Sequence, residues 1–364
     1  MLVRFISTFL CLALTIGQLE PVFAQEFSIN QLPVPGTMIG LTPAFSPVAL
    51  KGIIVNTKNP LELQFILDTG KKSVNPQDIK SDANLLLKYF LTGLTVPEKD
   101  LWVNLSPYEK DRIIPDALGQ TELGRDLLAQ DYILKQLTAS LIYPEKDLGH
   151  AFWQRVYKKA QEQFGTTNIP VNTFNKVWIL PNEAQVFENK NAAYVTKSTL
   201  KVMLDEDYVA LNKNSKNTST PTHSIASQIV REIVLPEIEK EINTGTNFAP
   251  LRQIYQALIL AKWYKETVKN ALFEAIYTNK NKIAGVNLED TTLTQQIYQR
   301  YLEAYKKGVF NYIKEETGPS NKVSSKKYFS GGITQLMSME IDRIGTAPSF
   351  DTNDTNFAMA SMTI

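Results

Sequence analysis

The chain has 364 residues, of which 43% are hydrophobic, with 38 basic and 37 acidic side chains. This composition predicts a folded protein with a sizeable core and excludes an intrinsically disordered chain. The net charge of +1 argues against a general electrostatic grip on nucleic acid or on an anionic membrane surface.

The first 24 residues have the pattern of a secretory signal peptide. Arg4 gives a positive start, residues 5–17 form an apolar run, and Val22-Phe23-Ala24 suits cleavage before Gln25. The apolar run is too short to cross a bilayer, so we expect an exported, periplasmic or secreted protein without stable membrane insertion. A retained membrane helix is the alternative. Cys11 is the only cysteine, so the mature chain would be free of cysteine.

The first half of the mature chain predicts an arm, a hairpin and helices. Residues 26–50 are rich in Pro and Gly and predict an extended arm or irregular β structure. Strands at 51–56 and 61–68 flank a turn and predict a hairpin. Apolar residues at helical spacing then predict three helices: residues 82–94, a helix capped by Thr121 that runs to Leu141, and a helix from Pro144 to Gly165.

The second half predicts a meander and a second helical block. Three strands are expected at residues 176–180, 184–188 and 192–204, followed by a polar linker or loop at 212–222. Helical stripes follow around residues 225–234, after a kink or new start at Pro236, from Pro250 onward, and at 292–316. Residues 349–364 predict a mobile tail.

These elements predict an α+β fold in which a hairpin and a three-stranded meander pack with two helical blocks. The expected organisation is a signal peptide (1–24), an N-terminal α+β region (25–211), the linker or loop (212–222), a C-terminal helical region (223–330) and a mostly flexible tail (331–364). The two regions either stand apart or pack as one domain.

Several stretches resemble a group of uncharacterised exported bacterial proteins. They are Asn104–Pro115, Gly119–Gly149, Ile169–Pro181 and Arg231–Lys265, and the similarity extends over about residues 33–332. The resemblance implies an exported envelope or periplasmic protein. No activity, cofactor or catalytic residue is attached to that group, so no site residue transfers.

The sharpest chemical motif is Asp68-Thr69-Gly70 after an apolar strand, which is how aspartic peptidases present a catalytic carboxylate. That chemistry needs two carboxylates sharing one proton, and the chain holds no second copy of the motif. The alternative is a strand that ends in a Thr-Gly turn, with Asp68 bonding the local backbone. Asp68 is thus a weak catalytic candidate.

The remaining motifs are weaker still. Ser198-x-x-Lys201 and Ser324-x-x-Lys327 match a short nucleophile motif, but Ser198 falls in a predicted strand. The two histidines, His150 and His223, favour surface or capping roles. Asp351–Asn356 resembles only part of a calcium loop. Aromatic residues at helical spacing could line a sugar or peptide groove but favour a core: Trp263, Tyr264, Tyr298, Tyr301 and Tyr305.

The sequence therefore favours an exported protein that acts by non-catalytic binding or scaffolding in the cell envelope, with an envelope protein, peptide or glycan as partner. We expect no cofactor and no metal site. The alternative is a carboxylate-dependent hydrolase of an envelope polymer or peptide. The acidic residues considered for it are Asp68, Asp100, Glu109, Asp111 and Asp131.

Overall fold

The structure is a computed structural model that describes residues 12–14, 33, 39–56, 58–59, 62–70, 76–104, 113–142, 147–167, 177–205, 207–208, 228, 230–276, 299, 315–317, 323–325, 341–345 and 357–363. The strands are β1 (Leu12–Leu14), β2 (Ala49–Val55), β3 (Glu62–Asp68), β4 (Val177–Asn189), β5 (Ala192–Leu204), β6 (Glu315–Thr317), β7 (Val323–Ser325), β8 (Ile341–Ile344) and β9 (Phe357–Thr363). The helices are α1 (Pro76–Thr95), α2 (Asp116–Gly119), α3 (Glu122–Ile142), α4 (Asp147–Phe164), α7 (Leu235–Thr244) and α8 (Ala249–Ile276), with short turns η2 (Glu98–Asp100) and η5 (Val230–Val234).

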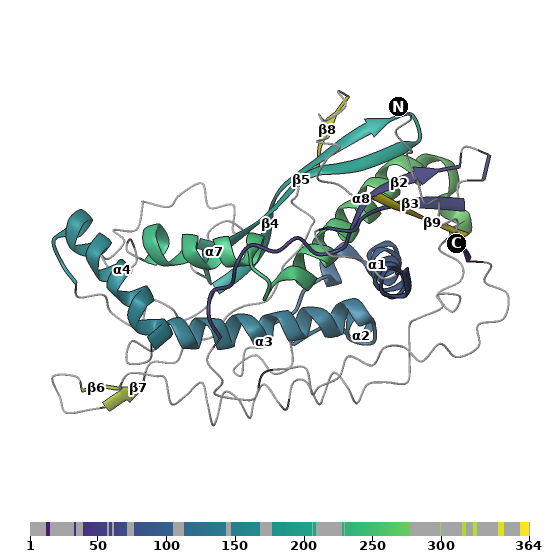
Figure 1. The fold of residues 1–364 in the computed structure, drawn as a ribbon. Coiled ribbons are helices and arrows are strands. Elements are labelled where there is room, and N and C mark those ends of the chain that lie inside the picture. The colour runs from purple at the N-terminus through teal and green to yellow at the C-terminus, as the bar shows by residue number, and fades with distance from the viewer. Residues whose placement is uncertain are drawn as a thin grey trace, which may run out of the picture.

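Seven strands form one mixed sheet in the order β1-β9-β3-β2-β5-β4-β8 (Figure 1). The outer pairs β1–β9 and β4–β8 are parallel, and the other neighbours are antiparallel. Strand β2 joins the early hairpin to the later strands by pairing with β5. The α+β class is therefore confirmed. Strands β6 and β7 pair with each other in a separate antiparallel ribbon.

The predicted hairpin is present as β2 and β3. Its turn is held by Asn56, whose Oδ1 accepts the Lys58 N–H at 2.9 Å and whose Nδ2 donates to Glu62 at 2.8 Å. Side chains alternate along β3, so that Leu63, Phe65 and Leu67 all point to one side and are buried. One face of the hairpin thus belongs to the core.

The later strands form one long hairpin, whereas the sequence predicted a three-stranded meander. The segments expected at 176–180 and 184–188 are a single strand, β4, which pairs with β5 over its length. Residues 181–183, which separated the two expected strands, are accommodated by an irregularity in register between Pro181 and Glu183. Bulges are where a strand tolerates a proline, because its missing N–H then costs no ladder bond.

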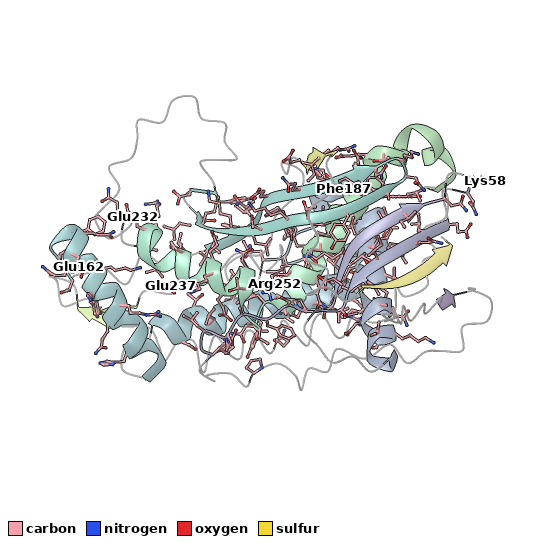
Figure 2. The ribbon with its side chains drawn as sticks, turned by 45° about the horizontal axis from the view of Figure 1, so that its top comes forward. Lys58, Glu162, Phe187, Glu232, Glu237 and Arg252 are labelled. Carbon is pink, nitrogen blue, oxygen red and sulfur yellow. The ribbon has the colours of Figure 1, made fainter. Side chains whose placement is uncertain are left out.

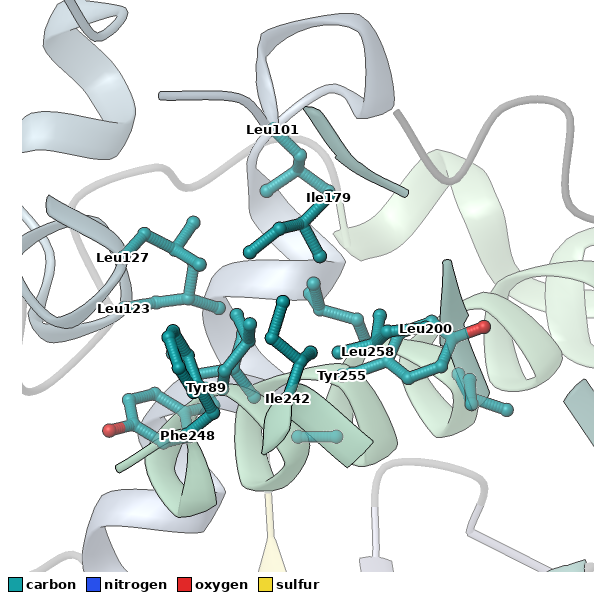
Figure 3. Close-up of a cluster of buried hydrophobic side chains, with 14 of the residues drawn as sticks. Tyr89, Leu101, Leu123, Leu127, Ile179, Leu200, Ile242, Phe248, Tyr255 and Leu258 are labelled. Carbon is teal, nitrogen blue, oxygen red and sulfur yellow. The ribbon is translucent and has the colours of Figure 1, made fainter. Parts of the chain in front are cut away.

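The helices pack in two layers on one face of the sheet, called here the inner face. Helices α1 and α8 contact β2, α7 and α8 contact β5, and α3 lies beyond them against α1 and α8 (Figure 1). Figure 3 shows buried side chains from these layers, among them Tyr89, Leu123, Leu200, Ile242 and Leu258. The N-terminal and C-terminal helical blocks therefore share one core.

Aromatic rings join the layers at the centre of this core. Phe65 on β3 and Phe90 on α1 meet edge to face with centroids 5.1 Å apart, and Phe90 meets Tyr264 on α8 at 6.1 Å. Each fully buried ring contributes about 2 kcal/mol by leaving water, and edge-to-face contact adds to this. Tyr264 and Trp263 are core residues, as their helical spacing indicated.

Local signals read from the sequence define the helix ends. The Thr121 hydroxyl accepts the Gly124 N–H at 3.0 Å and caps α3, as predicted. Helix α4 ends at Gly165, whose φ of +66° is the left-handed conformation that glycine adopts without strain. Pro236 lies in the first turn of α7, after the π-helical turn η5, so it marks a new helix start.

The arm that precedes β2 is clasped by the corner between α7 and α8. The Glu241 carboxylate accepts the Thr42 N–H at 2.8 Å, the Thr42 hydroxyl at 2.5 Å and an Asn247 amide N–H at 2.9 Å. Arg252 donates to the Phe45 carbonyl at 2.8 Å. These bonds compensate the buried carboxylate and fix the arm beside the helices.

The C-terminal segment differs from its expected mostly flexible state. Strand β9 pairs with β3 over seven residues, from Glu62 opposite Thr363 to Asp68 opposite Phe357, and β8 pairs with β4. These pairings are long-range, and a short uncharged segment carries no local sign of them. The linker or loop at 212–222, most of the helix expected at 292–316 and the cleavage site after Ala24 lie outside the described residues.

Candidate functional site

The face of the sheet opposite the helices, called here the outer face, carries the motif residue Asp68. Helices α1, α7 and α8 contact β2 or β5, and Asn243 and Glu239 of α7 accept the backbone N–H groups of Leu200 and Val202 on the open edge of β5. The inner-face residues of β3 are buried, whereas Glu62 and Gln64 are exposed, and Ile66 and Asp68 are half-buried. The outer face is thus the less buried face of β3.

A row of apolar residues crosses this outer face. The backbone register aligns Ile344 of β8 with Phe187 of β4, Phe187 with Tyr194 of β5, Tyr194 with Gly52 of β2, and Gly52 with Ile66 of β3. Apart from Gly52, these side chains are half-buried. Figure 2 labels Phe187 on the β4–β5 hairpin. The outer face thus presents a continuous apolar stripe, which we call the apolar row.

Gly52 is the one position of the apolar row without a side chain. A Cβ there would lie 2.9 Å from the Ala193 carbonyl oxygen, 3.1 Å from Ile66 and 3.2 Å from Tyr194. The space above the backbone is therefore already filled by the two flanking side chains. The glycine lets Ile66 and Tyr194 approach each other over β2.

Asp68 ends β3 and stabilises the turn that follows. Its Oδ1 accepts the Gly70 N–H at 2.9 Å, which is the local backbone bond expected of a strand-ending Asp-Thr-Gly turn. Gly70 has φ +62°, and a Cβ there would lie 2.3 Å from the Ser46 carbonyl oxygen. The turn is therefore closely packed against the arm, and this role accounts for both Asp68 and Gly70.

Two titratable side chains share the electrostatic surroundings of Asp68. Lys51 is the extra residue at the β2 bulge, between Leu50 and Gly52. Burial lowers the pKa of the Lys51 ammonium, and the negative Asp68 opposes this effect. Burial also raises the pKa of Tyr194 to about 12, with a further contribution from Asp68. Lys51 and Asp68 thus place two ionisable groups near Tyr194 of the apolar row.

The other residues singled out by sequence are scattered. Ser198 lies within β5, as expected, and its hydroxyl receives a bond of 3.4 Å from Gln256. Asp131 is buried in an ion pair with Lys135 one helical turn along α3. His150 is exposed on α4. Asp100 is the last residue of η2, which follows α1. Several candidates lie outside the described residues, namely Glu109, Asp111, His223, Tyr298, Tyr301, Tyr305, Lys327 and residues 351–356.

A buried polar cluster between α1 and α3 was missed by sequence reasoning. The Tyr89 hydroxyl of α1 donates to the Asp126 carboxylate of α3, which is only 8% exposed. Lys88 Nζ lies 2.7 Å from Glu122 Oε1, and Arg125 lies 3.5 Å from the same oxygen. The sequence signal is the i,i+4 pair of acids around Arg125 inside a Leu-rich helix.

Burial sets the acidity of this cluster. It raises the pKa of Asp126 to about 7, against the opposing effects of the Tyr89 hydrogen bond and of Arg125. Burial also raises the pKa of Tyr89 well above its ordinary value, with the Asp126 charge as the next cause. Asp126 therefore takes up and releases a proton near neutral pH, which is the property required of a general acid or base.

The described residues offer neither a metal site nor a membrane span. They contain no group of three or more His, Cys, Asp or Glu side chains placed to hold a metal ion. None of the helices built from them has the length and apolarity that crossing a bilayer requires.

Comparisons with known proteins find no family model, no curated protein and no solved structure that matches this chain.

Proposed function

We propose that this chain is exported with cleavage after Ala24 and acts in the cell envelope by binding another molecule without covalent chemistry. The single observation that carries the proposal is the apolar row, which crosses five strands on the outer face with side chains that are only half-buried. Half-buried aromatic and branched side chains on a rigid sheet offer apolar contact area at little entropic cost. The partner is an envelope protein, peptide or glycan.

The Asp68 turn supports binding over catalysis. Its carboxylate accepts a backbone N–H and stabilises a close approach between Gly70 and the arm, which is a structural task. A shared-proton mechanism needs a second carboxylate beside it. Asp68 is the charged group that contributes to the pKa shifts of both Lys51 and Tyr194.

Photo-crosslinking tests the binding proposal. A photoreactive phenylalanine analogue is placed at Phe187 on the outer face and, as the control, at Glu162, which is exposed on α4 (Figure 2). Illumination of whole cells should give a discrete crosslinked product only from position 187, and Tyr194→Ser should reduce its yield. Equal products from both positions would refute a role for the outer face.

Export is tested separately by the N-terminus of the recovered protein. Mass spectrometry of the protein from the periplasmic fraction should give a chain that begins at Gln25. Recovery of the intact N-terminus from the cytoplasm would refute the export part of the proposal.

The alternative is a carboxylate-dependent hydrolase, and Asp126 is the observation that favours it. Its pKa of about 7 suits proton transfer, and its neighbour Glu122 is paired with Lys88 and Arg125. Asp126 is nevertheless buried against Tyr89, within the core. Incubation with peptidoglycan fragments or a casein digest separates the two functions, since turnover by the wild type that Asp126→Asn abolishes would favour the hydrolase.

A further inference from the structure

Strand β9 is held on its two sides by different parts of the chain. On one side it pairs with β3 over seven residues. On the other side it pairs in parallel with β1, through Leu12 opposite Ala360, Ala13 opposite Ser361 and Leu14 opposite Met362. Strand β1 therefore forms the edge of the sheet and satisfies backbone groups of β9.

The residues that cover β9 belong to the segment expected to leave on export. Leu12–Leu14 lie in the middle of the apolar run that precedes the cleavage site after Ala24. Without them, the strand order begins at β9. The backbone N–H and C=O groups opposite Leu12–Leu14 then lose their partners.

The sequence of β9 carries none of the features that protect an edge strand. Natural edges are guarded by charged residues, by proline or by bulges. The segment Phe-Ala-Met-Ala-Ser-Met-Thr has no charge and no proline, and its pairing with β3 runs without a register shift. An edge of this kind is a template on which another strand adds.

We propose that β9 of the exported protein binds an extended, uncharged apolar segment of a partner, which adds as a parallel strand in the place of Leu12–Leu14. This inference rests on the proposed export and concerns the β9 edge of the sheet, a site separate from the outer face. The occupant of the edge in the structure has the sequence Leu-Ala-Leu and runs parallel to β9. Two copies of β9 related by a two-fold axis would pair antiparallel, so the parallel direction favours a different segment over a second copy of this chain.

The test uses the chain that begins at Gln25 and a fluorescein-labelled peptide of residues 9–17 carrying Cys11→Ser. Fluorescence anisotropy should show saturable binding, and the uncleaved chain, whose edge is occupied, should bind at least about tenfold more weakly. The chain that begins at Gln25 is prepared directly, so the result does not depend on whether cells export it.

Two N-methylated peptides show whether binding is strand addition. Successive backbone amides of a strand point to opposite sides, so methylating one alternate set should abolish binding while methylating the other leaves it within about twofold. Equal binding of the two peptides would indicate apolar adhesion and overturn the proposal. Absence of binding by the unmethylated peptide would also overturn it.

Protein variants locate the site. Ser361→Lys places a charge in β9 and should weaken peptide binding at least about tenfold, whereas Asp342→Lys in β8, at the opposite edge of the sheet, should leave it unchanged. Thermal unfolding of both variants checks that they fold. A dimer in sedimentation that Ser361→Lys dissociates would assign the edge to a second copy and overturn the proposal.

Discussion

Replacement of Asp126 by asparagine should change how the stability of this protein depends on pH. The pKa of Asp126 is about 7 in the folded chain, against 3.8 for the ordinary group. At a pH between these two pKa values, the Asp126 carboxyl is deprotonated in the unfolded chain and protonated in the folded chain. This carboxyl group therefore makes the folded state less stable as pH rises from about 4 to about 7.

The size of the effect follows from the displacement of the pKa. A shift of about three pKa units corresponds to about 4 kcal/mol, which is fully expressed above about pH 7. Asparagine resembles the protonated carboxyl in shape, and its amide oxygen keeps an acceptor for the Tyr89 hydroxyl. We expect Asp126→Asn to match the wild type near pH 4 and to exceed its unfolding free energy by up to about 4 kcal/mol near pH 8.

Urea unfolding followed by tryptophan fluorescence measures this difference across the pH range. Subtracting the two curves removes the contributions of the other titratable groups that both proteins share. Tyr89→Phe is the companion variant, because loss of its hydrogen bond should raise the pKa of Asp126 further. Parallel wild-type and Asp126→Asn curves from about pH 4 to about pH 8 would refute the assignment of a raised pKa to Asp126.

Three further substitutions test local structure. Thr121→Ala removes the cap of α3 and should lower the unfolding free energy by about 1 kcal/mol in urea titrations, with Thr121→Ser restoring it. Gly70→Ala should cost at least about 2 kcal/mol in the same assay, because its φ is +62° and its Cβ would overlap the Ser46 carbonyl. Glu241→Ala leaves the Thr42 N–H without its acceptor and should speed hydrogen exchange across residues 39–48, whereas unchanged exchange would contradict the clasp.

The sequence predicted elements with local signals and failed where the partner is distant. The hairpin, the Thr121 cap and the end of α4 at Gly165 depend on residues a few positions apart. The sequence did not predict β4 as one strand, because Pro181-Asn182 favours a turn. Only the pairing with β5 shows that the strand continues through these residues with an irregularity in register. Strand β9 was missed because its partner β3 lies near the other end of the chain.

In the candidate site, too, features with local signals could be predicted from the sequence and features that depend on distant residues could not. The alternative role of Asp68, as an acceptor for its own turn, could be predicted from its motif because the bond spans two residues. The apolar row could not, since it depends on the register of five strands. The Asp126 cluster was missed because helical periodicity marks the leucines of α3 as core but does not show that a second layer also buries its acidic side chains.

The pairing of Glu62 with Thr363 sets when this protein can finish folding. Strand β3 is synthesised well before β9, because most of the described elements lie between them in the chain. The sheet therefore reaches its final width only after β9 has left the ribosome, and until then that side of β3 lacks its native neighbour. The topology itself thus postpones the compact state until late in synthesis.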